Sequence, residues 1–398
     1  MDKIKWTALL LVLLSAGLLI LQQSKVGDSG QIASDNVLVT TYLEADQRWR
    51  DRLEEISAGP GTYEEKDPQL EVVRQQRPDA EPAVSAAIRL TQSDASLDDK
   101  TRAADFLIYR AQGAEHRDEA ILKGMKAMAK LDADYSEWQK ALLLADIYMP
   151  PGFNTTLDAF FEEFDTYVSQ PNARAAARYH AAMRRMMLAN RGDEAVEVRA
   201  AHRARALELA QGLSVGVEND TLMRRQPPDQ KGERQPYPTF SVAEKELLFL
   251  LNAVTLGQPL PNVEQPAIEG HTDSLAAYRG RTVLLDFWAT WCSPCIDALP
   301  TLDTLKAELP DEKFEIISIN TDAELETLSR FLNERPMPWV HWYVGEYSPW
   351  LQQWSIRGFP TYMLVDGEGV LVAKQHGIND EFLTLVRDTA CRGTSGVC

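Results

Sequence analysis

Cysteine and histidine are scarce in this sequence, with four cysteines and six histidines among 398 residues. A structural zinc site takes four ligands, drawn mainly from these two residue types at short spacings. Cys391 and Cys398 are wrongly spaced to form a second zinc knuckle beside Cys292 and Cys295, and the histidines form no pair at ligand spacing. The sequence therefore predicts neither a metal site nor a bound cofactor.

Positive charge is also in short supply. The chain has 41 Lys and Arg against 59 Asp and Glu, a formal net charge of −18. Because phosphate binding needs clustered basic side chains, this charge opposes nucleic acid, and we expect no nucleic-acid partner. Hydrophobic residues make up 44% of the chain, which is enough to form buried hydrophobic cores. A chain of 398 residues is longer than a typical single domain, so we expect at least two domains.

Long apolar runs are absent except for one near the N-terminus. Lys3 and Lys5 precede sixteen uncharged residues, Trp6 to Leu21. This run is short for a membrane span and long for the core of a signal peptide, so residues 1–25 are predicted to be a signal-anchor or a signal peptide. No small-x-small cleavage site follows closely and no cysteine offers a lipidation site. The uncleaved anchor is therefore favoured over a signal peptide, and a buried core helix is the third alternative.

Either export signal sends the rest of the chain out of the cytoplasm, because the two lysines are expected to stay inside. We therefore expect a protein of the bacterial inner membrane that faces the periplasm. If the segment is cleaved, the protein is expected to be secreted to the periplasm.

Residues 40–214 are rich in Ala, Leu, Glu and Arg, with apolar residues at helical spacing. Turn-forming residues at 150–152, 170–172 and 190–192 divide this region into helix-length segments. The pattern predicts an all-α domain of antiparallel helix pairs, arranged as a bundle or a repeat array. No consensus recurs at a period of roughly 34 residues, so a plain bundle is favoured. The turn-rich stretch 57–82 is predicted to be irregular.

A polar, proline-rich segment at 215–238 predicts an extended linker, and residues 239–398 are expected to form a second domain. A helix is expected at 241–256, with Ser241 as its N-cap and Glu244 closing a capping box. The aromatic-rich stretch 337–354 is interpreted as an insertion. Alternating elements beyond 256 predict an α/β domain with a central mixed sheet and helices on both faces. The expected strands are 283–287, 314–320, 362–365 and 370–374, and the expected helices are 292–308, 323–334 and 379–390.

The most informative motif is a strand joined directly to a pair of cysteines. The apolar run Val283 to Phe287 leads into Cys292-Ser-Pro-Cys295. The first turn of a helix favours a thiolate through its unpaired N–H groups and dipole, so Cys292 is predicted to be the reactive sulfur. Pro294 is tolerated in that turn, and Cys295 lies close enough to form a disulfide. A half zinc site or a structural pair is the alternative, but the missing further ligands favour a redox dithiol.

The region from roughly residue 259 to 390 resembles the thioredoxin superfamily, and more narrowly the membrane-tethered TlpA/ResA-like thiol-disulfide oxidoreductases of bacteria. Pro300 stands where these proteins kink the active-site helix, and Gly358-Phe359-Pro360-Thr361 is similar to their cis-proline loop. The resemblance implies a thioredoxin-like fold for this domain. The chain departs from the family at Ile296-Asp297-Ala298, where the family's acidic residue is missing. It also departs at Asp286, where relatives tend to have asparagine.

Asp286 is the next candidate catalytic residue. Its neighbours in the strand are all apolar, so its carboxylate is expected to be partly buried behind Cys295 with a raised pKa. Resemblance to thioredoxin implies that it takes the proton from Cys295 when that sulfur attacks the mixed disulfide on Cys292. The alternative is a carboxylate that caps a helix or faces water.

The cis-proline loop and two tryptophans are the candidate substrate-binding elements. A cis bond before Pro360 turns the preceding peptide groups toward the dithiol, where a peptide can lie across Cys292. Phe359 and Trp291 are then predicted to shape the substrate groove, and Trp288 to pack in the core. The alternatives are an ordinary trans proline and a plain packing role for both tryptophans.

Cys391 and Cys398 flank a glycine-rich hexapeptide near the C-terminus. In an oxidising compartment such a pair is predicted to close a small structural disulfide loop. A second redox pair that relays electrons to Cys292, or two free thiols, are the alternatives.

Together these features predict an exported thiol-disulfide oxidoreductase that reduces protein disulfides, with electrons from a membrane donor of the thiol-disulfide type. Cytochrome c maturation, envelope repair and surface assembly are all compatible roles. One alternative is that the helical half is a scaffold for partners with an accessory redox domain. Another is a thioredoxin-like copper metallochaperone, with the cysteine pair and a histidine such as His376 as ligands. Those proteins space their cysteines by three residues, and no Thr-x-x-Cys motif of a peroxidase is present.

Overall fold

The structure is a computed structural model that divides into two compact units, Met1–Ala177 and Arg178–Cys398. The side chains of residues 3–28, 63–64, 155–157 and 165 are not described. The structure describes residues 3–111, 117–131, 138–139, 142, 155–224, 236–268, 270–346 and 348–392.

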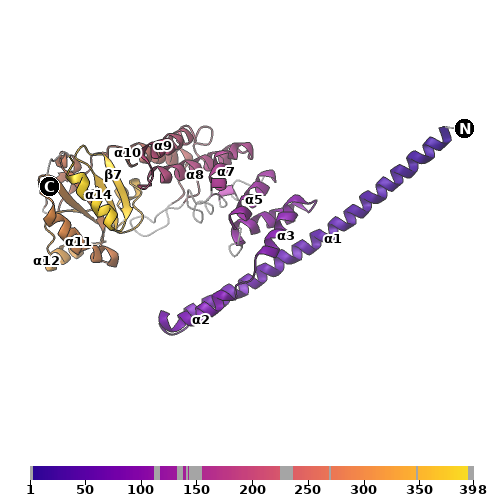
Figure 1. Ribbon diagram of the computed structural model, residues 1–398, viewed down its shortest axis with the longest axis horizontal. Coiled ribbons are helices and arrows are strands. Elements are labelled where there is room, and N and C mark those ends of the chain that lie inside the picture. The colour runs from indigo at the N-terminus through magenta and orange to yellow at the C-terminus, as the bar shows by residue number, and fades with distance from the viewer. Residues whose placement is uncertain are drawn as a thin grey trace. The chain divides into compact units, whose positions relative to one another are not determined.

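All of the described secondary structure in the N-terminal unit is helical, as predicted (Figure 1). Its longest helix, α1, packs along α2 and α3. The contact with α3 includes an ion pair in which Arg89 donates to the buried Asp35 over 2.7 Å. The elements are α1 (Lys3–Ala58), α2 (Tyr63–Gln75), α3 (Glu81–Gln92), α4 (Leu97–Asp105), the π-helical turn η1 (Phe106–Arg110), α5 (Arg117–Lys130), α7 (Thr155–Glu162) and the 3-10 turn η2 (Phe164–Thr166).

One prediction for this unit was wrong, because the stretch 57–82 contains α2. This helix begins with a capping box, in which the side chain of Thr62 accepts from the Glu65 N–H and the Glu65 carboxylate accepts from the Thr62 N–H. Such reciprocal bonds satisfy two N–H groups that a helix start leaves unpaired. The local cap therefore starts a helix within a sequence whose prolines and glycines suggest turns.

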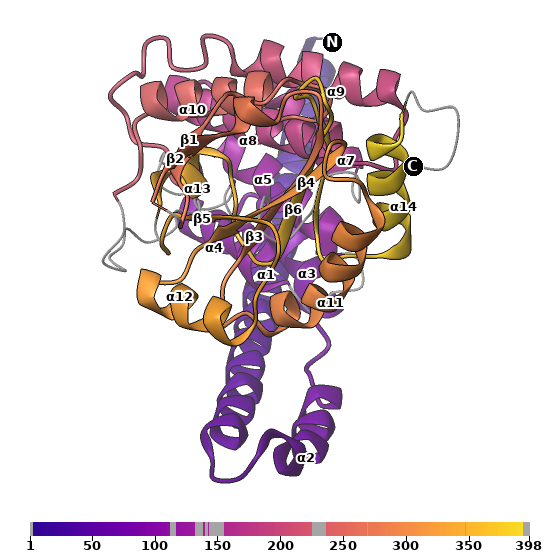
Figure 2. The same ribbon diagram turned by 90° about the vertical axis from the view of Figure 1, so that its left-hand side faces the viewer.

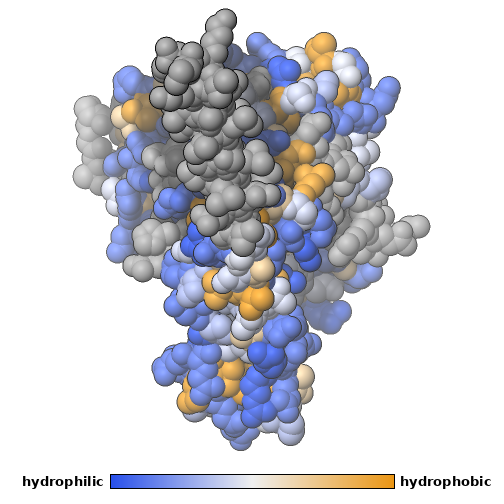
Figure 3. Space-filling view, turned by 90° about the vertical axis from the view of Figure 1, so that its right-hand side faces the viewer, coloured by the Kyte–Doolittle hydropathy of each residue, from blue (hydrophilic) through white to orange (hydrophobic). Residues whose placement is uncertain are grey.

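The predicted anchor or signal segment, residues 1–25, lies in the part of the chain whose side chains are not described. Among the described residues, no helix combines the length and the apolar character that a membrane crossing requires. The coloured part of the surface in Figure 3 is mainly hydrophilic, with hydrophobic residues in small separate groups.

The C-terminal unit contains a five-stranded mixed sheet in the order β5-β4-β3-β6-β7. β3 and β5 pair with β4 in parallel, whereas β6 pairs with β3 and β7 in antiparallel fashion. The bounds are α8 (Pro171–Ala189), which crosses the unit boundary, α9 (Val196–Ala210), α10 (Phe240–Ala253), β1 (Glu264–Pro266), β2 (Thr272–Ser274), η3 (Leu275–Tyr278), β3 (Thr282–Trp288), α11 (Ser293–Glu308), β4 (Phe314–Asn320), α12 (Leu325–Glu334), β5 (Val340–Tyr343), α13 (Pro349–Gln353), β6 (Thr361–Val365), β7 (Leu371–His376) and α14 (Asp380–Ala390).

Helices cover both faces of this sheet, as predicted (Figure 2). Side chains of α11, α12 and α14 pack on one face, where Leu284, Trp288 and both cysteines of the motif are buried. Side chains of α10, η3 and α13 pack on the other face, against Leu285 and Phe287. Because successive side chains of a strand point to opposite faces, β3 contributes to both cores.

The seven strands and helices predicted from 283 to 390 are confirmed to within two residues at each end. The interpretation of 337–354 as an insertion was wrong, because this stretch contains β5 and α13. β5 is only four residues long, and its apolar pattern is interrupted by His341. Pairing with β4, which aligns Val340 with Ile317, makes it a strand.

The N-terminal end of α10 also differs from the prediction. Its N-cap is Thr239, whose hydroxyl accepts from the Val242 N–H over 3.4 Å, and not Ser241. The Glu244 carboxylate does not close a capping box, since it accepts from the Gly212 N–H over 2.6 Å and the Ser214 N–H over 3.1 Å. A tertiary contact to the loop after α9 thus replaces the local one.

The unit boundary lies inside α8, earlier than the predicted linker at 215–238. The helical residues from Arg178 onward belong to the C-terminal unit. One contact that joins them to it is the hydrogen bond from Arg203 of α9 to the carbonyl oxygen of Leu251 in α10, over 2.7 Å. Residues 225–235 of the predicted linker lie outside the described residues. Its two ends are hydrogen-bonded to each other, since the Leu222 N–H donates to the Pro238 carbonyl over 2.8 Å.

Candidate active site

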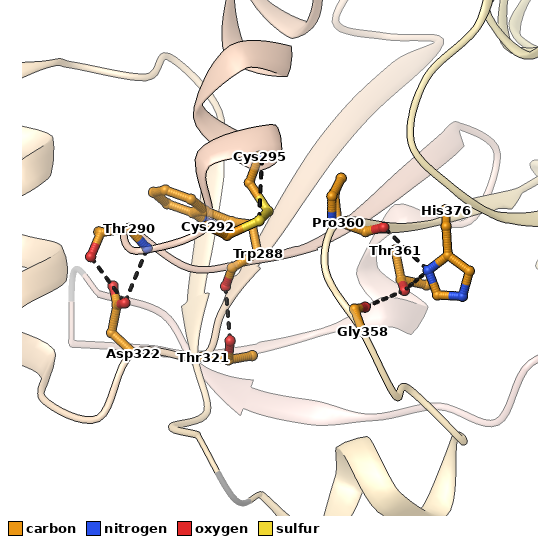
Figure 4. The surroundings of a disulfide bond; sticks show 10 residues. All are labelled: Trp288, Thr290, Cys292, Cys295, Thr321, Asp322, Gly358, Pro360, Thr361 and His376. Atoms are coloured by element: carbon orange, nitrogen blue, oxygen red, sulfur yellow. Dashed lines mark hydrogen bonds between the residues drawn. A yellow bond between two sulfur atoms is a disulfide. The ribbon is translucent and has the colours of Figure 1, made fainter. Parts of the chain in front are cut away.

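Cys292 and Cys295 are joined by a disulfide at the N-terminal end of α11 (Figure 4). Cys292 is the N-cap of this helix, and its Sγ accepts from the Cys295 N–H over 3.3 Å. Cys292 is 5% exposed and Cys295 2% exposed. The geometry places Cys292 where N–H groups and the helix dipole favour a thiolate, which is the location that the sequence predicted.

The loop between β3 and α11 is held by residues at the end of the neighbouring parallel strand, β4. The buried Asp322 accepts two hydrogen bonds of 3.0 Å from Thr290, one from the N–H and one from the hydroxyl (Figure 4). Thr321 donates from both its N–H and its hydroxyl to the Trp288 carbonyl oxygen, each over 3.0 Å. These bonds hold the loop on both sides of Ala289.

Sequence reasoning missed Asp322 and Thr321. The available signal was Asn320-Thr321-Asp322, a polar triplet directly after a buried strand. The carboxyl ends of adjacent parallel strands lie at the same edge of a sheet. The same rule that places Cys292 at this edge therefore places Asp322 there too.

Replacing Asp322 with alanine is expected to lower the free energy of unfolding by about 2 to 3 kcal/mol, because buried hydrogen bonds to a charged group are lost and their donors are left unpaired. Urea unfolding followed by tryptophan fluorescence measures this effect. Thr290→Val removes only the hydroxyl bond and serves as the matched control, with an expected loss of about 1 kcal/mol. An Asp322→Ala protein as stable as the wild type would contradict the assignment.

Asp286 is buried in β3, 1% exposed, so it neither caps a helix nor faces water. By strand alternation it shares the sheet face of Leu284 and Trp288, which is the face against both cysteines. The Ser318 hydroxyl donates to its Oδ2 over 2.8 Å, and the Trp339 indole N–H donates to the Ser318 oxygen over 2.8 Å. A chain of two hydrogen bonds thus runs from Trp339, in the stretch 337–354, through Ser318 to the Asp286 carboxylate.

Burial raises the pKa of Asp286 to about 7, and the hydrogen bond from Ser318 opposes this rise. Its other oxygen, Oδ1, has no hydrogen-bond partner among the described residues. Tyr362 lies opposite in β6, and burial together with the charge of Asp286 raises the pKa of that phenol. A carboxyl group with a pKa near neutrality can exchange a proton with a thiol at physiological pH.

The predicted substrate-binding residues lie together beside the disulfide. The Phe359–Pro360 peptide bond is cis, as the family resemblance implied. Trp291 is 61% exposed, and its ring meets that of Phe359 edge to face with centroids 5.8 Å apart. Trp288 is buried in the core, as expected. The exposed Trp291 and the half-buried Phe359 form an apolar surface next to the cysteines.

His376, the ligand of the copper alternative, lies behind the cis-proline loop. Its Nδ1 is 3.0 Å from the Thr361 hydroxyl oxygen and 3.4 Å from the Pro360 carbonyl oxygen. Within the described ranges, no three or more His, Cys, Asp or Glu side chains form a group that suits a metal ion. The copper alternative therefore finds no ligand set among these residues.

Cys391 directly follows α14 as its C-cap. Its predicted disulfide partner, Cys398, lies outside the described residues. The structural loop at the C-terminus stays a prediction.

Known proteins resemble the C-terminal part of the chain. Residues 255–387 match the family model described as Redoxin. A thiol-disulfide oxidoreductase ResA from Geobacillus kaustophilus is 28% identical over 119 residues, which are 29% of this chain and 67% of the relative. A thioredoxin-like protein, YneN from Bacillus subtilis, is 39% identical over 89 residues, which are 22% of this chain and 48% of the relative.

Solved structures with a similar domain include the thioredoxin domain of a thiol-disulfide oxidoreductase from Bacteroides vulgatus. It is 28% identical, and the match covers 34% of this chain and 99% of that domain with a TM-score of 0.32. These similarities concern the α/β domain.

Proposed function

We propose that the protein reduces protein disulfides through Cys292 and Cys295. The proposal builds on the similarity of the C-terminal part of this chain to thiol-disulfide oxidoreductases of the thioredoxin superfamily. The observation behind this proposal is the disulfide at the start of α11, with the buried Asp286 on the same face of the sheet. Beside it, the exposed Trp291 in edge-to-face contact with the half-buried Phe359 suits a polypeptide substrate.

The reaction starts from the reduced dithiol. The Cys292 thiolate attacks one sulfur of the substrate disulfide, that S–S bond breaks, and one substrate thiolate leaves as a mixed disulfide forms. The Cys295 thiolate then attacks the Cys292 sulfur, and the second substrate thiolate leaves. Two electrons have passed from the protein to the substrate, and the Cys292–Cys295 disulfide has formed.

Asp286 supplies the proton transfer for the second step. Because Cys295 is buried, its thiol needs a nearby base before it can attack. Above pH 7 the Asp286 carboxylate is mostly charged, so it can take the Cys295 proton and pass it to the departing substrate thiolate. Protons and electrons are thereby balanced within the site.

Export and the electron donor complete the proposal. The apolar run in residues 1–25, preceded by lysines, suits an inner-membrane anchor that leaves the catalytic domain in the periplasm. A membrane donor with its own dithiol then reduces the Cys292–Cys295 disulfide by the reverse exchange. Disulfides of apocytochromes, envelope proteins or surface proteins are substrates of the required chemistry.

The redox potential tests the direction of the reaction. Equilibration of the full-length protein with glutathione buffers, followed by alkylation of free thiols, measures it. We expect a reducing potential, at about −270 mV or below. A potential of about −120 mV would mark a strong oxidant and would reverse the proposed direction.

A further inference from the structure

β7 lies behind the cis-proline loop, and two of its side chains contact this part of the chain, one just before the loop and one at its end. Lys374 and His376 are two residues apart, so they project from the same face of the strand. Lys374 Nζ donates to the carbonyl oxygens of Trp354 over 2.9 Å and Ser355 over 3.3 Å. These carbonyls precede the loop, whereas His376 contacts its end.

The contacts of His376 surround the residue that precedes the cis-proline. Its Cε1 is the nearest atom to the place where a side chain would begin at Gly358, 3.9 Å away, and its Nδ1 faces Pro360 and Thr361 (Figure 4). The imidazole therefore contacts the loop after Phe359 and lies near Gly358 before it, on the side opposite the disulfide in Figure 4.

Hydrogen-bond chemistry decides which nitrogen bears the proton. The Thr361 hydroxyl donates its single proton to the Gly358 carbonyl over 2.6 Å. The same oxygen can then only accept from His376, and the Pro360 carbonyl is also an acceptor. Nδ1 of His376 must therefore carry a hydrogen and act as the donor to both.

The peptide groups of Phe359 stay available for a substrate. Among the described residues, neither its N–H nor its C=O has a hydrogen-bond partner. An extended peptide beside Cys292 can use such groups for main-chain hydrogen bonds. Their direction depends on the loop being fixed on either side of Phe359.

We propose that His376, together with Thr361, is a positioning residue that fixes the cis-proline loop so that Phe359 can bind the backbone of a protein substrate. The inference rests on the proposed function, since it concerns the same site. His376 is exposed, so its ring is not part of the core, and its hydrogen-bond contacts are those to Thr361 and Pro360 of the loop.

Substitution of His376 with phenylalanine tests the proposal. The ring is kept but the Nδ1 donor is lost, so we expect the KM for a peptide with one internal disulfide to rise about fivefold to tenfold, while kcat stays near that of the wild type. The reaction of the reduced protein with bis(2-hydroxyethyl) disulfide, which has no backbone to bind, is expected to be unchanged.

Two amide substitutions provide a matched pair of controls. His376→Asn places an amide nitrogen near the position of Nδ1 and is expected to restore the KM. His376→Gln places the amide nitrogen near the position of Nε2 and is expected not to restore the KM. Thr361→Val removes the partner hydroxyl and should reproduce the effect of H376F, and Thr361→Ser should not.

The outcomes separate this inference from the proposed function. An H376F protein with the wild-type KM, or one that reacts equally slowly with the peptide and the small disulfide and is not rescued by asparagine, overturns the role of His376. A wild-type protein that reduces neither compound overturns the proposed function itself.

Discussion

Replacing Cys295 with alanine is expected to stop turnover and to leave a stable mixed disulfide between Cys292 and the substrate. Cys292 can still attack, because it retains its position as the N-cap of α11. The second displacement lacks its sulfur, so disulfide-reducing activity should fall by at least about 10³-fold. Insulin reduction measures the loss, and non-reducing electrophoresis of the full-length protein shows the adduct.

The adduct also identifies the substrate and tests the order of the two sulfurs. A Cys292→Ala protein is the matched control, since it is equally inactive but should form no adduct. If C292A traps substrates and C295A does not, the nucleophile is Cys295 and the assignment is reversed. Mass spectrometry of the proteins captured by C295A in the native envelope names the physiological partner.

Replacing Asp286 with asparagine is expected to slow the second step. Asparagine keeps the shape of the side chain but cannot accept the Cys295 proton, so release of the second substrate thiol should slow by about 10²-fold at pH 7.5. In the wild type this rate should rise with pH and level off above about 7, where the carboxylate is charged. Single-turnover kinetics at several pH values measure both effects.

The same substitution is expected to stabilise the oxidised protein at alkaline pH. The folded pKa of about 7 lies above the ordinary value of 3.8, so the folded state holds a proton that the unfolded state has lost between these pH values. Stability contributed by this carboxyl is therefore lost as pH rises from about 4 to 7. Asp286→Asn should exceed the wild type at pH 8 by up to about 4 kcal/mol, and the gap should close near pH 4.

Ser318→Ala is the matched control for the carboxyl group. It removes the hydrogen bond that opposes the raised pKa of Asp286, so the pH profile of the second step should move upward by about one pH unit. Urea unfolding from pH 4 to 9 measures the stability effect. If D286N and the wild type differ equally at pH 4 and pH 8, Asp286 does not titrate as described.

The sequence predicted the α/β domain well because its elements have strong local signals. β3 and β4 are continuous apolar runs, and α11 begins at a cysteine that caps it. β5 was missed because four residues with a histidine among them have no periodicity, and only β4 makes them a strand. Ser241 was wrongly predicted as the N-cap. The Glu244 carboxylate, expected to close its capping box, instead accepts hydrogen bonds from the N–H groups of Gly212 and Ser214.

The pairing of Cys292 with Cys295 at the start of a helix and the burial of Asp286 were predicted from the sequence alone. Two cysteines three positions apart after an apolar strand meet within one helical turn, whatever surrounds them. The residues that adjust this site were decided by the tertiary structure. Thr290 meets Asp322 across 32 positions, Trp339 meets Ser318 across 21, and His376 meets Thr361 across 15. Such contacts have no local periodicity, since they arise only when strands pair and bring distant polar side chains to one edge of the sheet.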